Sequence, residues 1–212
     1  MMIKLLGRAP SINVRKVLWT CAEIGLAVER EEWGTAALPL HDPAFLKLNP
    51  NALVPVLIDR DGDGDFVLWE SNAICRYLAA QHGRSDLLPA APRERARVEQ
   101  WMDWQASELN NAWRYAFMGL VRRSAAHADP ALIAASLAAW ARHLAVLEQA
   151  LERSGAFATG PVFTLADIVL GLSVHRWFMT PGDKPALPQV AAYYERLSQR
   201  PAFMEHGRNG LP

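Results

Sequence analysis

Val54 and Pro55 form the first of three short segments whose polar groups could bind and activate a peptide-like ligand. They head an apolar run, where a proline is expected at a strand entry and not within a hydrogen-bonded ladder. If the Val54-Pro55 bond is cis, the Val54 backbone turns outward with a free N–H and C=O. Those groups could pair with an extended peptide, as an added strand does. An ordinary trans proline opening an edge strand is the alternative interpretation.

Glu70 and Ser71 form the second segment, between the end of an apolar run and the start of a helical pattern. Unpaired backbone N–H groups and the Ser71 hydroxyl at a helix start can bind a carboxylate, and the helix dipole strengthens that site. Glu70 beside it could meet an ammonium group, so the pair suits an amino-acid head group. A helix cap with no ligand would use the same residues.

Ser11 and Asn13 form the third segment, in the loop that joins the first strand to the first helix. A hydroxyl aimed at a bound thiol near a helix start would stabilise the thiolate and lower its pKa from about 8.5. Each unit of lowering corresponds to about 1.4 kcal/mol, so one or two hydrogen bonds suffice and no general base is required. Either residue could instead simply cap the helix.

Composition and charge exclude several other function classes. The chain has 212 residues, 51% of them apolar, and its 22 basic and 22 acidic side chains cancel, which argues against a nucleic-acid or anionic-membrane role. The short apolar start is interrupted by Lys4 and Arg8, so a cytoplasmic location without a membrane span is expected. Cys21 and Cys75 are far apart and predicted to be buried thiols. The six histidines lack ligand spacing, so no metal site is predicted.

The elements that must position the three segments alternate in type over residues 1–83, which is typical of βαβ units on a mixed sheet. The pattern predicts strands at 3–6, 28–33, 54–58 and 66–69, with helices at 13–24, 43–48 and 71–82. Residues 59–65, rich in Asp and Gly, predict a polar hairpin loop. This order resembles thioredoxin-like domains with a mixed four-stranded sheet.

The rest of the chain favours helices. Residues 84–92 hold two prolines and no sustained period, which predicts a linker. An all-α domain is then predicted over 93–212, with one long amphipathic helix at 93–123 and further helices at 131–153, 164–178 and 188–199. Thr164 and Asp167 predict a capping box at the third of these. The fold class is therefore α+β.

Taken together, three motifs of the first domain resemble the glutathione-binding domain of the cytosolic glutathione transferases. They are Ser11-x-Asn13-x-Arg15-Lys16-Val17, Leu48-Asn49-Pro50-Asn51-Ala52-Leu53-Val54-Pro55-Val56-Leu57 and Glu70-Ser71-Asn72-Ala73-Ile74-x-Arg76-Tyr77-Leu78. Phe163-Thr164-Leu165-Ala166-Asp167 resembles the family's capped helix in the second domain, so the resemblance spans the chain. The pattern is most similar to the bacterial, theta-like branch.

The resemblance implies a role for each segment. Ser11 would hold the glutathione sulfur, with Asn13 assisting or replacing it. Val54, before a cis Pro55, would pair with the cysteinyl backbone, and Glu70 with Ser71 would hold the γ-glutamyl end. His41 resembles a position that meets the glycine carboxylate.

The sequence departs from the family pattern at one point, and the resemblance also implies a site for the second substrate. Ala52-Leu53 replaces a frequent Gly-Lys, so either the affinity for glutathione is modest or Lys47 and Asn51 substitute for the missing lysine contact. A pocket for a small-molecule electrophile is expected on the long helix, with a wall that includes Trp113, Arg114, Tyr115 and Met118.

The implied assembly is a two-fold homodimer in which Asp103 could reach the neighbour's glutathione. The predicted activity is thiolate attack on a small apolar electrophile, with glutathione as co-substrate. A glutathione-dependent reductase of disulfides or peroxides, and a non-catalytic binding protein of the same fold, remain the alternatives.

Overall fold

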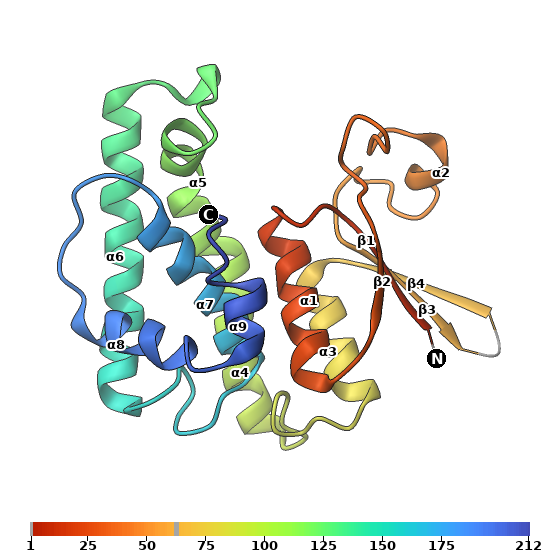
Figure 1. Cartoon of the computed structure of the whole chain (residues 1–212). Coiled ribbons are helices and arrows are strands. Elements are labelled where there is room, and N and C mark those ends of the chain that lie inside the picture. The colour runs from red at the N-terminus through yellow and green to blue at the C-terminus, as the bar shows by residue number, and fades with distance from the viewer. Residues whose placement is uncertain (1, 62–63) are drawn as a thin grey trace.

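The computed structural model describes residues 2–61 and 64–212, which form a sheet domain followed by a helical domain (Figure 1). The sheet contains β1 (Met2–Leu6), β2 (Val28–Glu31), β3 (Val56–Asp61) and β4 (Gly64–Trp69). The strands lie in the order β2-β1-β3-β4; β2 runs parallel to β1 and the other two pairs are antiparallel. The predicted mixed four-stranded sheet is therefore confirmed.

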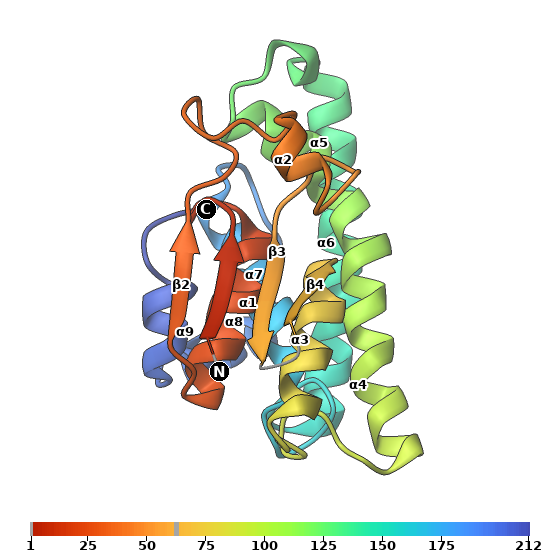
Figure 2. The same ribbon diagram turned by 90° about the vertical axis from the view of Figure 1, so that its right-hand side faces the viewer.

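The helices of this domain bring the chain segments of interest to one end of the sheet. Helix α1 (Ile12–Ile24) and helix α3 (Ser71–Gln81) pack together between the sheet and the helical domain (Figure 1), while the short α2 (Pro43–Leu46) lies apart from them near the C-terminal end of β1 (Figure 2). Helix α1 ends where Gly25 adopts the left-handed conformation, with φ of 84°, that glycine accommodates without a steric penalty.

The predicted polar loop at 59–65 is wrong in extent. Strand β3 continues through Asp61 and β4 begins at Gly64, so Arg60 and Asp65 face each other across the strands, and their side chains form an ion pair at 3.2 Å. Residues 62 and 63 lie outside the described part of the chain. Strand β2 also ends earlier than predicted, at Glu31.

The helical domain contains more elements than the sequence predicted. Its elements are α4 (Pro92–Trp104), the π-helical turn η1 (Gln105–Leu109), α5 (Asn110–Leu120), the 3-10 turn η2 (Ala125–His127), α6 (Pro130–Ser154), α7 (Leu165–Met179), α8 (Pro188–Leu197) and α9 (Pro201–His206). The single helix predicted at 93–123 is thus a helical run interrupted by a π turn. Turn η2 and helix α9 had not been predicted.

Helix α7 is the centre of the molecule. Every residue from Leu165 to Trp177 is buried, and the helix packs against both α1 and α4. A Cβ atom on Gly171 would lie 2.6 Å from Leu197 Cδ1 and 3.0 Å from Trp19, so a glycine lets these helices approach closely. The predicted capping box of Thr164 and Asp167 is present at the start of α7.

The segment between the domains is tied to both. Leu87 and Leu88 are buried, and the Leu87 carbonyl accepts a hydrogen bond of 3.0 Å from the Leu165 amide. Arg84 donates to the carbonyl of Glu23 at the end of α1. The two domains therefore meet along a packed junction, with a hydrophobic core that runs through both.

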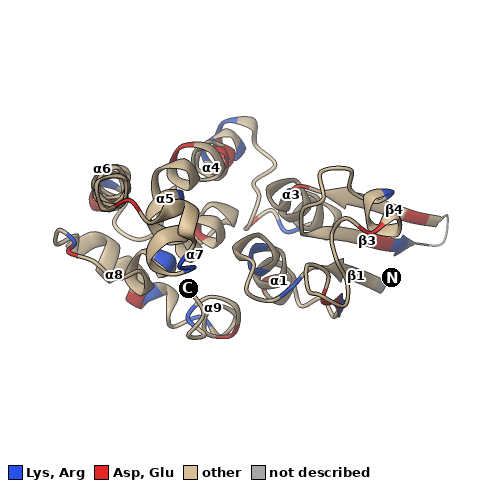
Figure 3. Ribbon diagram, turned by 90° about the horizontal axis from the view of Figure 1, so that it is seen from above, with Lys and Arg blue, Asp and Glu red and all other residues tan. Residues whose placement is uncertain are grey.

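Two further predictions concern buried thiols and charge. Cys21 and Cys75 are free and buried, as predicted. Seen from above, acidic and basic residues are interspersed over both domains (Figure 3).

By length and composition α6 could cross a membrane, but one such helix does not indicate a membrane protein, and α6 packs here against α5 and α8.

Candidate functional site

A small groove lies where the first two segments meet the start of α1. It is lined by Asn13, Asn49, Asn51, Leu53, Val54, Pro55, Glu70 and Ser71. Five of the predicted site residues are therefore brought together from three stretches of the chain that are far apart in sequence. The Val54-Pro55 peptide bond is cis, as the resemblance implied.

The backbone beside Pro55 is held by an asparagine that the sequence analysis gave no role. Asn49 is buried; its Nδ2 donates to the Leu53 carbonyl at 2.8 Å, and its Oδ1 accepts from the Asn51 amide at 3.1 Å. This local turn fixes residues 49–53 without using Val54. Within the described residues, the backbone N–H and C=O of Val54 form no hydrogen bond, so both groups are available to a ligand. An Asn-Pro-Asn sequence just before the strand is the signal that could have identified the turn.

Glu70 and Ser71 lie at the start of α3. Glu70 is exposed and has a positive φ of 74°, a region that residues other than glycine seldom adopt. Ser71 is buried at the first helical position. The unusual backbone of Glu70 turns the chain sharply from β4 into α3, so that its carboxylate and the free N–H groups of the helix start flank the same groove.

Ser11 and Asn13 lie at the start of α1. Ser11 occupies the N-cap position, yet its side chain forms no capping hydrogen bond. Asn13 lines the groove beside Pro55, whereas Ser11 is half-buried and is not among the lining residues. The hydroxyl of Ser11 is thus not consumed by the helix cap.

The remaining predicted residues lie elsewhere. His41 is exposed in the loop before α2, outside the lining of the groove; Lys47 is also exposed, whereas Asn51 lines the groove. Asp103 forms an ion pair with Arg76 of α3 in its own chain. Among residues 2–61 and 64–212, no cluster of three or more His, Cys, Asp or Glu side chains could hold a metal ion.

The four residues predicted for the electrophile pocket lie on α5, and none of them lines the groove. Arg114 is exposed, whereas Tyr115 and Met118 are half-buried. Trp113 is buried, and its Nε1 donates to Asn110 Oδ1 at 3.1 Å. Trp113 therefore belongs to the core of the helical domain.

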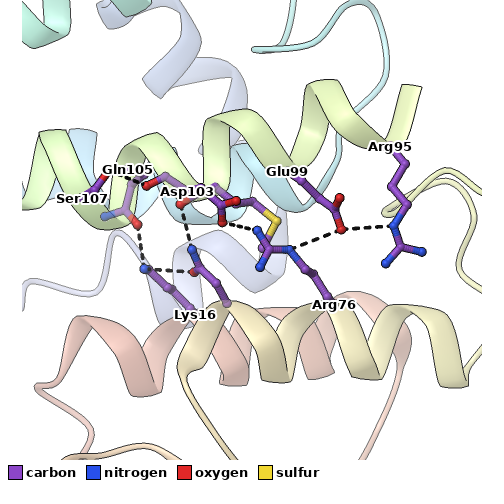
Figure 4. Close-up of polar contacts among 9 residues, drawn as sticks. Lys16, Arg76, Arg95, Glu99, Asp103, Gln105 and Ser107 are labelled. Atoms are coloured by element: carbon purple, nitrogen blue, oxygen red, sulfur yellow. Dashed lines mark hydrogen bonds and ion pairs between the residues drawn. The ribbon is translucent and has the colours of Figure 1, made fainter. Parts of the chain in front are cut away.

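A buried polar network joins the start of α1 to the helical domain (Figure 4). The Lys16 ammonium donates to Asn72 Oδ1 at 3.2 Å and to Gln105 Oε1 at 2.6 Å. Asn72 Nδ2 donates to the Met102 carbonyl at 2.8 Å, and Gln105 Nε2 donates to Asn110 Oδ1 at 2.9 Å. Because Asn110 also accepts from Trp113, a continuous hydrogen-bonded chain connects Lys16 with the aromatic core of α5.

A second set of contacts runs alongside this network on the surface of the junction. Arg76 pairs with Asp103 and, at 3.6 Å, with Glu99, which also accepts from Arg95 at 3.1 Å (Figure 4). These pairs are partly exposed, so each contributes little to stability and is weakened by salt.

Three buried cations at the junction escaped the sequence analysis. Burial lowers the pKa of Lys16 to about 8, that of Arg15 to about 10 and that of Arg176 to about 9. Arg176 stacks on the rings of Trp113 and Phe117, with its guanidinium carbon 4.5 Å and 4.0 Å from the ring centres. A basic residue within a helical pattern is normally assigned to the solvent face. When a helix is buried on several sides, its sequence does not show that the basic residue is buried too.

Comparison with known proteins identifies the family to which the chain is similar. The family models "Glutathione S-transferase, N-terminal domain" and "Glutathione S-transferase, C-terminal domain" match residues 10–81 and 130–196. Glutathione S-transferase GstB of Escherichia coli (strain K12) is 41% identical over 201 residues, 95% of this chain and 95% of the relative. Glutathione S-transferase 3 of Zea mays is 34% identical over 210 residues, 96% of this chain and 92% of the relative.

Solved structures agree with the sequence relatives. The theta class glutathione S-transferase from Xanthomonas axonopodis pv. citri, with glutathione bound, matches with a TM-score of 0.90 at 42% identity and covers 99% of both chains. The apo form of that protein matches with a TM-score of 0.82 at 39% identity over the whole of both chains.

Proposed function

Because the chain belongs to the glutathione S-transferase family, we propose that it binds glutathione in the groove beside Pro55 and activates the sulfur for attack on a small apolar electrophile. The observation that carries this proposal is the meeting of Asn13, Val54 and Glu70 at one groove from three separate segments. A protein that kept only the fold would have no need for that convergence.

Each part of the groove suits one part of the tripeptide. The free backbone N–H and C=O of Val54 can pair with the cysteinyl residue as an added strand does. Ser71 and the N–H groups at the start of α3 can bind the γ-glutamyl carboxylate, while the exposed Glu70 carboxylate meets the ammonium. The cysteinyl side chain then points toward the start of α1.

The chemistry required of the protein is modest. The thiol proton leaves to solvent, Ser11 or Asn13 donates a hydrogen bond to the resulting thiolate, and the helix start adds positive potential. The sulfur lone pair forms a bond to the electrophilic carbon as the leaving group departs with its electron pair. Thiolate stabilisation and proximity supply the rate enhancement.

The proposals for the second substrate and the assembly rest on accessible side chains of α5 and β4. We infer that the electrophile approaches from α5, where Arg114, Tyr115 and Met118 are wholly or partly accessible. We also infer a cytoplasmic two-fold homodimer, which would cover Phe66 and Trp69, the exposed aromatic side chains of β4. Asp103, at the edge of the junction, is then available to the neighbouring site. His41 could reach the glycine carboxylate after movement of its loop.

The test combines calorimetry of glutathione binding with turnover of 1-chloro-2,4-dinitrobenzene. The double variant Ser11→Ala with Asn13→Ala should keep its fold and lose about 10- to 100-fold in kcat/KM near neutral pH, since one to two pKa units of thiolate stabilisation are removed. Ser154→Ala at the far end of α6 serves as the matched control and should have wild-type activity. Undiminished turnover in the double variant would refute the assigned mechanism, and absence of glutathione binding by the wild type would refute the function itself.

A further inference from the structure

The Lys16 ammonium is a buried positive charge without a counter-ion. Lys16 is only 1% exposed. Both acceptors of its hydrogen bonds, Asn72 Oδ1 and Gln105 Oε1, belong to neutral amides. Within the described chain, no carboxylate lies at ion-pair distance from this nitrogen. A buried charge of this kind is costly, because its water shell has been replaced by only two neutral dipoles, and a cost of this size points to a functional role.

The charged and titratable groups that act on Lys16 come from α3, from the residue before it and from α7. From α3, Cys75 is a neutral thiol whose pKa is raised to about 11 by burial, and Arg76 is already paired with Asp103. From α7, Arg176 adds a second positive charge. Among the described residues, Glu70 is the carboxylate whose charge acts on Lys16, and it lies at the surface of the groove.

Lys16 also lies within the first turns of α1, the helix whose start is proposed to face the sulfur. It follows Asn13 by three residues on α1, which is less than one helical turn, or about 5 Å along the axis. One of its acceptors, Asn72, directly follows Ser71 at the start of α3. The ammonium therefore bridges from α1 to the first turn of α3 and to Gln105 of the helical domain (Figure 4).

We propose that Lys16 is a positioning residue that keeps the sulfur of bound glutathione ionised through space: its unpaired ammonium supplies positive potential at the start of α1, and Asn72 and Gln105 hold it there. The inference rests on the proposed function. No bond to Lys16 forms or breaks, and the thiol proton still leaves to solvent; the charge only favours the ionised sulfur.

The second acceptor gives the helical domain a part in the chemistry. Gln105 is the first residue of the π turn η1, and its Nε2 is fixed by Asn110 and by Ser173 Oγ, each at 2.9 Å. A π turn within a helix shifts the side chains that follow it, and such turns are frequent at functional sites. The Gln105 amide is thus aimed at Lys16 by the domain that also supplies the electrophile's wall.

The decisive variant is Gln105→Glu. It keeps the shape and the acceptor oxygen but gives Lys16 a counter-ion, so it neutralises the potential without removing the contact. The pKa of bound glutathione, followed by thiolate absorbance or by the pH dependence of kcat/KM, should rise by about one unit. The rate at a pH below that pKa should fall about 10-fold and recover at higher pH. Gln199→Glu, the same change at an exposed position beyond α8, should leave the profile unchanged.

Two variants at Lys16 complete the test. Lys16→Met should shift the pH profile in the same direction as Gln105→Glu, and Lys16→Arg, which keeps the charge, should restore most of the wild-type profile. Asn72→Asp repeats the charge neutralisation at the other acceptor should Gln105→Glu fail to fold. Wild-type pH profiles in the folded acidic variants would overturn the inference while leaving conjugation intact. A wild type that neither binds glutathione nor conjugates it would instead be a failure of the proposed function.

Discussion

Tyr193 donates a hydrogen bond of 3.0 Å to the Asp167 carboxylate and so ties α8 to the capped start of α7. The same carboxylate accepts from the amides of Ala158 and Thr164 at 2.9 Å and 2.8 Å. Burial raises the pKa of Asp167, and these hydrogen bonds oppose that effect. One side chain thus satisfies donors from three parts of the helical domain.

The first prediction concerns the stability that this carboxylate provides. Asp167→Asn replaces one acceptor by an NH₂ group that faces amide donors, so the free energy of unfolding should fall by about 2–4 kcal/mol. The matched control is Asp129→Asn at the start of α6, where the aspartate is exposed and one oxygen accepts from the Ala131 amide; an asparagine can do the same, and the expected cost is below about 0.5 kcal/mol. Urea unfolding measures both, and equal costs would contradict the assigned role.

The second prediction is a pH dependence of stability caused by Lys16. Its pKa is about 8 in the folded chain against 10.5 as the ordinary value, so between those limits the unfolded chain binds more protons. The free energy of unfolding should therefore rise with pH in this window, by at most about 1.4 kcal/mol per pH unit from this group.

The contribution of Lys16 is measured by comparing the pH dependence of the free energy of unfolding between the wild type and Lys16→Met. Other groups titrate in the same range, among them Cys75, whose raised pKa has the opposite effect on stability. Because these groups are common to wild type and Lys16→Met, the rise from pH 7.5 to 9.5 should be larger in the wild type by about 1–2 kcal/mol. Lys47→Met, at an exposed position, should behave as the wild type does. Parallel pH curves for wild type and Lys16→Met would rule out the buried charge.

The third prediction separates stability from binding at Glu70. Its positive φ of 74° is strained for any side chain, so Glu70→Gly should raise the free energy of unfolding by about 0.5–1 kcal/mol. The same change removes the carboxylate, and the glutathione dissociation constant should rise at least about 10-fold. Glu70→Gln keeps the strain and removes only the charge, so it should lose affinity without gaining stability. A stable Glu70→Gly with wild-type affinity would show that Glu70 does not bind the ligand.

The extent to which sequence determined these conclusions differs between elements. Helices α1 and α3 were predictable because apolar residues such as Val14, Val17, Ile74 and Leu78 recur at helical spacing and pack on one another. The cis bond before Pro55 and the meeting of Val54 with Glu70 depended on the family motifs, since a single V-P-V would not have indicated either.

Other features left no local signal. Helix α9 is six residues long and buries only Phe203, so it has no period to detect. The π turn at Gln105 lies in a run of residues that all favour a helix. Its wider hydrogen-bonding pattern is visible only in the folded structure. The partners of Lys16 lie 56 and 89 residues away in the chain. The electrostatics of the site therefore arise from tertiary contacts and could not be derived from spacing.

The last prediction concerns Arg15, which anchors residues 206–212. Its guanidinium donates to the carbonyls of His206, at 2.6 Å, and Leu211, at 2.9 Å, and also to that of Gly207. His175 Nε2 is a second anchor, 2.8 Å from the Leu211 carbonyl.

Arg15→Met should release this segment, because a methionine side chain has no hydrogen-bond donor for the carbonyls of residues 206–212. Amide hydrogen exchange of residues 207–211 should then become at least about 10-fold faster, with little change in α6. Arg15→Lys keeps the charge and one or two of the bonds, so its exchange should lie between the two. His175→Phe keeps an aromatic ring but loses the hydrogen bond to the Leu211 carbonyl. It should loosen the segment less than Arg15→Met does. If the amide exchange of residues 207–211 is equally fast in the wild type and in Arg15→Met, the segment is not held by Arg15.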